Sequence, residues 1–112
     1  MKTMGTTVTF VKRSDGALIG FSAIGHSGYA EAGSDIVCAA ISAAVELTIT
    51  TVNDVCGGKA KLRVKEEDAR ITLTLPAQCE EEESIQAALT GLMLYLCNLR
   101  DEYSDYIEVL EV

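Results

Sequence analysis

The segment GHSGYAEAGSDIVCAAIS, residues 25–42, decides how this chain folds, because it joins a strand-like run to a helical one. The run before the segment is apolar and strand-forming, and from Asp35 onward apolar residues recur every three or four positions. Glycines inside the segment interrupt both patterns and indicate a loop. The segment holds His26, the chain's single histidine, and Cys38, which follows the predicted helix start. We expect the strand exit and the helix start to meet at one sheet edge.

Outward from this segment, the pattern predicts the order β-β-α-β-β-α-β. Strands are predicted over Thr6–Lys12 and over residues 17–24, 61–65, 71–75 and 106–112, and helices over residues 35–55 and 80–101. The two strands after the first helix alternate apolar and polar residues, which predicts that each is half-buried. The fold class is therefore α+β: a two-layer sandwich with a mostly antiparallel five-stranded sheet and two helices on one face.

Capping signals predict where these elements begin and end. Ser34 or Asp35 is the expected N-cap of the first helix, and the glycines that follow residue 56 end it. Asp15 and Gly16 predict a hairpin turn between the first two strands. The acidic run at residues 80–83 is interpreted as first-turn charge that favours the second helix dipole, and not as a metal site.

The composition limits the classes of partner. With 112 residues the chain suits one domain, residues 1–112, and its small size makes a homodimer plausible. The formal net charge of −8 argues against a nucleic acid or an anionic membrane as partner. It suits a cationic peptide, or it only keeps a cytosolic protein soluble. No apolar run of membrane-spanning length is expected, and the first residues lack a signal-peptide pattern, which favours a cytoplasmic location.

The four cysteines show no metal-binding or redox spacing. Cys38, Cys56, Cys79 and Cys97 are widely separated and contain no C-x-x-C pair, so neither a zinc site nor another cofactor is predicted. A reducing compartment with free thiols fits this usage.

Cys38 and His26 are residue types that together perform nucleophilic chemistry. A cysteine in the first turn of a helix lies in the positive field of the helix dipole, which favours the thiolate. An imidazole within hydrogen-bond distance takes the thiol proton and later returns it to a leaving amine. The residues alone leave a structural interpretation open, in which Cys38 is a small buried side chain and His26 is a solvated loop residue.

The other polar and glycine positions of the segment also have two interpretations. Asp35 caps the helix or orients His26, and Ser42, one turn after Cys38, bonds a backbone carbonyl or lines a pocket. Gly25 supplies a backbone conformation closed to other residues or lets a substrate backbone approach.

The segment resembles the signature of the ribosomal-processing (Prp-like) cysteine proteases. In that family the pattern is roughly G-H-A, a spacer, and then G-x-D-I-V-C-A-A-V-S, and this chain departs from it at Ser27 and Ile41. The length and the order of elements also fit that family. The resemblance implies that Cys38 is the nucleophile and His26 the general base and acid. It further implies a homodimer that removes a short N-terminal extension from the precursor of large-subunit ribosomal protein twenty-seven. The family's substrates have apolar and aromatic residues before the cut, which would need an apolar pocket, and the candidates to form it are Phe21, Ile24 and Tyr29.

Two other functions stay open at this point. The chain could be a non-catalytic ribosome-assembly or ribosomal-protein-binding module that uses its acidic surface. It could also carry another thiol activity, redox sensing or acyl transfer, if the fold brings Cys79 close to Cys38.

Overall fold

The computed structural model describes residues 5–25 and 32–112, and at residues 32–35 and 68 the backbone alone. Within these residues the strands are β1 (Thr6–Lys12), β2 (Leu18–Ile24), β3 (Lys61–Lys65), β4 (Arg70–Thr74) and β5 (Ile107–Glu111). The helices are α1 (Ala32–Thr50), which continues into the π-helical turn η1 (Thr51–Val55), and α2 (Glu82–Glu102); a 3₁₀ turn, η2 (Glu66–Asp68), joins β3 to β4. The predicted order of elements is therefore confirmed.

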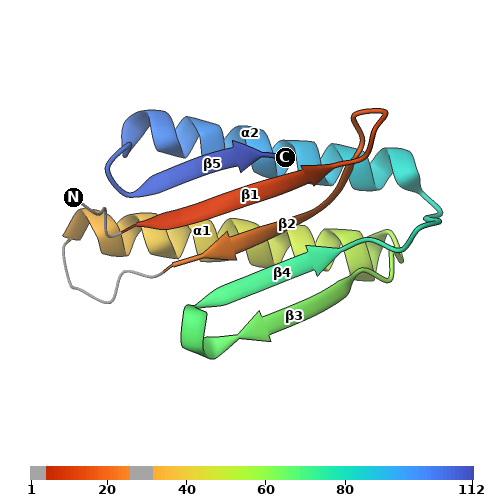
Figure 1. The fold of residues 1–112 in the computed structure, drawn as a ribbon, viewed down its shortest axis with the longest axis horizontal. Coiled ribbons are helices and arrows are strands. Elements are labelled where there is room, and N and C mark those ends of the chain that lie inside the picture. Colours follow the sequence, from red (N-terminus) through yellow and green to blue (C-terminus); the bar gives the residue numbers. More distant parts are fainter. Residues whose placement is uncertain (1–4, 26–31) are drawn as a thin grey trace.

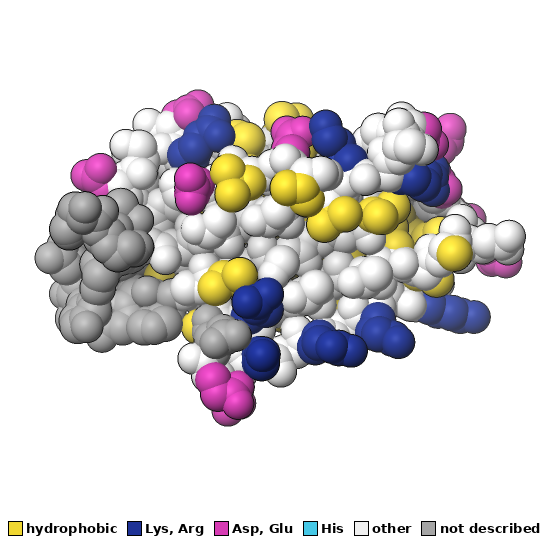
Figure 2. Space-filling model, viewed as in Figure 1, with side chains coloured by type: hydrophobic (Ala, Val, Ile, Leu, Met, Phe, Trp, Pro, Cys, Tyr) yellow, Lys and Arg dark blue, Asp and Glu magenta, His cyan; other side chains and the backbone are white. Residues whose placement is uncertain are grey.

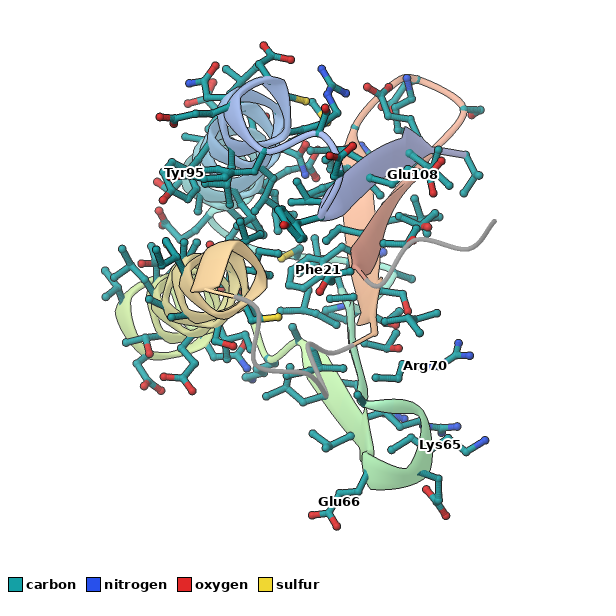
Figure 3. All side chains as sticks on the ribbon, turned by 90° about the vertical axis from the view of Figure 1, so that its left-hand side faces the viewer. Phe21, Lys65, Glu66, Arg70, Tyr95 and Glu108 are labelled. Carbon is teal, nitrogen blue, oxygen red and sulfur yellow. The ribbon has the colours of Figure 1, made fainter. Side chains whose placement is uncertain are left out.

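The sheet has the strand order β3-β4-β2-β1-β5. Neighbouring strands pair antiparallel except for β1 and β5, which run parallel to each other. Both helices lie against one face of this sheet and leave the other face open (Figures 1 and 3). The predicted α+β sandwich is confirmed, with a parallel pair at one edge that makes the sheet mixed.

The core lies between the sheet and the two helices. Phe10 and Phe21 are cross-strand partners on β1 and β2, and their ring centroids are 5.8 Å apart. Both rings are buried, and Figure 3 shows Phe21 pointing toward the helices. The predicted stripe of α2 supplies much of the opposing surface, with Ile85, Leu89, Leu92, Leu96 and Leu99 buried.

Two side-chain amides join helical segments to the backbone at or just before the start of a strand. The Leu18 N–H donates to Gln86 Oε1 at 2.7 Å, and Gln86 Nε2 donates to the Leu18 carbonyl at 2.6 Å. Asn53 forms the same pair of bonds with Ala60, at 2.7 and 3.2 Å. Each amide satisfies one backbone donor and one acceptor that the strand pairing leaves over, which fixes where β2 begins and how the chain approaches β3.

The predicted capping of the first helix is wrong. The helix begins at Ala32, so Ser34 and Asp35 lie inside its first turn and neither is the N-cap. Cys38 is therefore the seventh residue of α1 and lies in its second turn, whereas the sequence placed it third or fourth.

Strand β3 also departs from the prediction of two half-buried strands. All five of its residues are exposed, because β3 is the sheet edge and extends beyond the helices (Figure 3). Leu62 and Val64 face the helix side but remain 41% and 65% exposed. The alternation predicted which side chains share a face, but it could not show where the covering layer ends.

The segment Ile36–Val55 is long and apolar enough to cross a membrane by length and composition, contrary to the sequence-based expectation. Core helices of soluble proteins meet the same criterion, so one such helix is weak support for a span. Here one side of the segment packs on the sheet, with Val37, Ile41, Val45, Thr48 and Val52 buried. The absence of a membrane partner stays a prediction.

Candidate functional site

A pocket of about 260 Å³ lies between α1 and the helix-facing side of the sheet. Strands β1, β2 and β4 and the turn before β4 form one wall, and α1 forms the other. The lining residues are Thr6, Ala23, Gly25, Cys38, Ile41, Ser42, Val45, Glu46, Ala69 and Ile71. The pocket thus contains three of the predicted site residues, Cys38, Ser42 and Gly25.

Cys38 presents its thiol to this pocket from α1. Its side chain is half-buried, and its Sγ lies 4.0 Å from Oγ1 of Thr6, the first residue of β1. Thr6 is only 6% exposed. A hydroxyl in this position can donate to a thiolate, because a Ser or Thr hydroxyl has one donor and rotates to suit its partner. The thiol is therefore partly shielded from water and has a polar neighbour.

The helix dipole acts more weakly on Cys38 than the sequence predicts. The dipole field falls off within the first turn, and only the first four N–H groups of a helix lack partners inside it. Cys38 is beyond both limits, so its own N–H belongs to the helical ladder. Thiolate formation here needs a base or another donor near the sulfur.

Three backbone segments cross closely at Gly25, in the sheet wall of the pocket. Gly25 has a φ of +115°, and its N–H donates to the Ala69 carbonyl at 3.2 Å. A Cβ at this position would lie 2.5 Å from the Gly5 carbonyl oxygen and 3.2 Å from Cα of Thr6. This agrees with the first interpretation of Gly25, a backbone conformation closed to other residues, whereas the approach of a substrate backbone stays a prediction.

One face of α1 carries the polar lining. Cys38, Ser42 and Glu46 recur at four-residue intervals, so they project along the same side of the helix. Ser42 lines the pocket, which is one of its two predicted placements. Glu46 was missed, although this spacing could have identified it. Thr6 was also missed, and the inward alternation with Val8 and Phe10 was its signal.

Other predicted residues lie elsewhere or outside the described residues. His26 and Tyr29 are among the residues that the structure does not describe, and of Asp35 it gives the backbone alone. Phe21 does not line the pocket, because its ring is buried against Phe10 in the core. Ile24 does not line the pocket either, because it pairs with Arg70 on the open face.

The remaining thiols lie away from the pocket. Cys79 precedes α2 and lies near Cys56, at the far end of the α1–η1 helix. The 18 positions between Cys38 and Cys56 correspond to about 27 Å of helix, so Cys79 does not approach Cys38. Burial raises the pKa of the Cys79 thiol, and the nearby Glu82 adds to the shift. Among the described residues, no three His, Cys, Asp or Glu side chains gather in a group that could hold a metal ion.

Comparison with known proteins assigns this chain to a family. The family model described as cysteine protease Prp matches residues 5–108. The ribosomal processing cysteine protease Prp of Bacillus subtilis is 26% identical over 102 residues, which cover 88% of this chain and 91% of that protein.

Two crystal structures of Prp from Staphylococcus aureus share the fold. The complex with a substrate peptide aligns with a TM-score of 0.85 at 18% identity and covers 96% of this chain and 99% of that one. The complex with a covalently linked product peptide aligns at 0.82 with 20% identity and the same coverage.

These findings place the protein among the cysteine proteases. More particularly, because the family model spans most of its length, the chain belongs to the cysteine protease Prp family. The resemblance predicted from residues 25–42 is thereby confirmed.

Replacing Gly25 with alanine should destabilise the fold and distort the pocket. The Gly25→Ala variant must accommodate both a positive φ and a Cβ against the Gly5 carbonyl, at a cost of about 3 kcal/mol or more. Gly16→Ala is the matched control, because Gly16 has a φ of +93° with open space around it, and it should cost about 1 kcal/mol. Urea denaturation measures both; equal losses would show that the crossing at Gly25 is not a constraint.

Proposed function

We propose that the chain is an endopeptidase that removes the N-terminal extension of a ribosomal protein precursor, large-subunit protein twenty-seven, with a Cys38–His26 dyad. The pocket that joins Cys38, Ser42 and Gly25 carries this proposal, because it gives the thiol a recess in which a peptide carbonyl can be held. The Bacillus subtilis relative is a ribosomal processing protease, and this supports a ribosomal protein as the class of substrate. Gly25 lines the pocket and immediately precedes His26 in the chain.

The reaction follows from the two side chains. His26 takes the proton from Cys38, and the thiolate Sγ attacks the carbonyl carbon of the scissile bond to form an Sγ–C bond. His26 then protonates the leaving nitrogen as the C–N bond breaks, and the acyl group stays on sulfur as a thioester. Water deprotonated by His26 attacks the thioester, releases the new carboxylate and restores the thiol. Because the helix dipole acts weakly on Cys38, His26 carries the activation.

Two features of the pocket support a peptide substrate. Ala23, Ile41, Val45 and Ile71 give it apolar walls, and Glu46 places a carboxylate at its exposed side. A chain with a net charge of −8 also attracts a basic ribosomal protein over a longer range than contact. The remaining parts of the proposal are a single domain, residues 1–112, that acts in the cytoplasm without a cofactor.

A non-catalytic ribosomal-protein-binding module remains the alternative, and loss of the nucleophile separates the two. A peptide that spans the extension junction, from the same organism, should give two fragments by mass spectrometry. Cys38→Ala should lower the rate by at least about a thousandfold and His26→Ala by about 10²–10⁴-fold, while both still bind the peptide. Cys97→Ala is the matched control and should cleave normally. Cellular function retained by Cys38→Ala would establish the alternative.

Thiol labelling tests the activation of Cys38 independently of any substrate. Iodoacetamide at slightly acid pH should modify Cys38 first, because a base beside the sulfur increases its thiolate fraction. Cys79 should react slowest, because its raised pKa leaves the thiol protonated as the pH rises toward neutrality. His26→Ala should remove the advantage of Cys38. Labelling of all four cysteines at similar rates, followed by peptide mapping, would contradict the activated thiolate.

Homodimerisation belongs to the same proposal, and the outer faces of the helices support it. A groove of about 510 Å³ runs between α1 and α2, and its lining includes Leu47, 68% exposed, and Tyr95, 43% exposed. Gly91 and several alanines line it as well, so another surface can approach the helix backbones closely. An apolar groove of this kind is characteristic of a protein-protein contact.

Sedimentation should give twice the chain mass of 12.0 kDa for the wild-type protein. The Tyr95→Glu variant should sediment with the mass of a single chain, because the substitution places a charge in the groove. Thr90→Glu is the control, since Thr90 is exposed on the same helix but does not line the groove. A wild-type protein that sediments as one chain would rule out the dimer.

A further inference from the structure

Basic side chains gather on the open face of the sheet, although the chain as a whole is acidic. Lys61, Arg63 and Lys65 alternate along β3, and Arg70 lies on the adjacent β4. These are four of the nine lysines and arginines in the sequence. We call this set, with Thr72 and Thr74 of β4, the basic strip. Figure 2 shows its dark-blue side chains along the β3 edge.

The strand register places the basic strip on one side of the sheet. Lys61 pairs with Thr74, Arg63 with Thr72, and Lys65 with Arg70. Directly paired residues share a face, so cations and hydroxyls lie in two parallel rows. Figure 3 shows Lys65 and Arg70 pointing away from the helices. The six side chains line a groove of about 600 Å³.

Lys61 and Arg63 are the most available cations of the basic strip. Both are exposed, and within the described parts of the chain neither takes part in an ion pair. Lys65 and Arg70 have polar contacts of their own and contribute their charge to the groove. By contrast, Lys12 and Arg13 at the other end of the sheet pair with carboxylates. The strip is therefore a local positive surface on a negative protein.

We propose that the basic strip binds the phosphate backbone of duplex RNA. Lysine, arginine and threonine are side chains that contact phosphate and sugar oxygens, and these rows supply all three. The exposed rows on the sheet face suit the wide, shallow minor groove of an A-form helix, where threonine hydroxyls can meet 2′-hydroxyls. The strip has no aromatic side chain on which single-stranded bases would stack. It also has no apolar side chain to insert into a membrane.

This inference goes beyond the proposed proteolysis and uses none of its residues. It also replaces the expectation, drawn from net charge, that the chain avoids nucleic acids. The pocket opens on the helix-facing side of the sheet, so RNA on the open face leaves the thiol accessible. The surface would hold the enzyme on an RNA-containing substrate particle while the pocket receives the peptide.

The test is the salt dependence of binding to an RNA duplex of about 20 base pairs, longer than the roughly 16 that a double-stranded RNA-binding domain spans. Two neutralised phosphates, from Lys61 and Arg63, predict a slope of log K against log salt of about −2 between about 50 and 200 mM salt, and the slope approaches about −4 where Lys65 and Arg70 exchange their own contacts for phosphates. Lys61→Gln combined with Arg63→Gln should reduce the slope by about 2 and weaken binding at least about tenfold at the lower salt concentration.

Lys12→Gln combined with Arg100→Gln is the matched control. It removes two positive charges and therefore changes the net charge from −8 to −10, as the strip variant does, but leaves the basic strip intact. It should bind nearly as the wild type does. The proposal is overturned if wild-type protein does not bind the duplex at about 50 mM salt, or if both double variants lose affinity equally.

Further probes identify a different occupant of the surface. Binding to polyglutamate or to vesicles that contain phosphatidylserine, without binding to the RNA duplex, would overturn the proposal in favour of an acidic protein or a membrane. Equal affinity for a DNA duplex of the same length would overturn its RNA selectivity. Cys38→Ala should bind RNA normally, so failure of the proposed proteolysis and failure of this inference are separate results.

Discussion

The close crossing at Gly25 is the constraint on which the candidate site depends. There the exit of β2 passes against the backbone of Gly5 and Thr6 and bonds to Ala69, so three segments are held in contact by one residue without a side chain. The crossing holds the exit of β2 against the start of β1, where the Thr6 hydroxyl lies 4.0 Å from the Cys38 sulfur. A larger residue would separate these segments, and the pocket wall would no longer be continuous.

The position of Cys38 changes the physical account of its reactivity. In the first helical turn, unpaired N–H groups and the positive end of the dipole would favour negative charge without help. In the second turn the N–H groups are already bonded within the helix, and what remains is the pocket, the Thr6 hydroxyl and a general base. This makes the proposed chemistry more dependent on His26 than the sequence suggests. Donors for a developing oxyanion must likewise come from groups other than the Cys38 N–H.

Much of the fold was predictable because its strands and helices carry clear periodicities. The alternation of Thr6, Val8 and Phe10 identifies both a strand and its inward face, and the stripe of α2 identifies its buried side. The failures have specific physical causes. Ser34 and Asp35 are good caps by residue type, yet the helix begins before them, at Ala32. Leu62 and Val64 alternate as predicted with polar residues, but no helix covers their strand. Local sequence patterns specify which face of a strand or helix is buried, whereas tertiary packing decides how far the helix layer covers the sheet.

Strand β4 shows how one short element serves two surfaces. Successive side chains on a strand point to opposite faces, so Ile71 lines the pocket while Arg70 and Thr72 belong to the basic strip. Net charge is an average over the whole chain and hides such a division, because 17 acidic residues outweigh a compact group of four cations. The acidic remainder would keep an RNA contact weak and easily reversed by salt. A basic substrate and an RNA backbone could therefore engage opposite faces of one sheet without competing for the same charges.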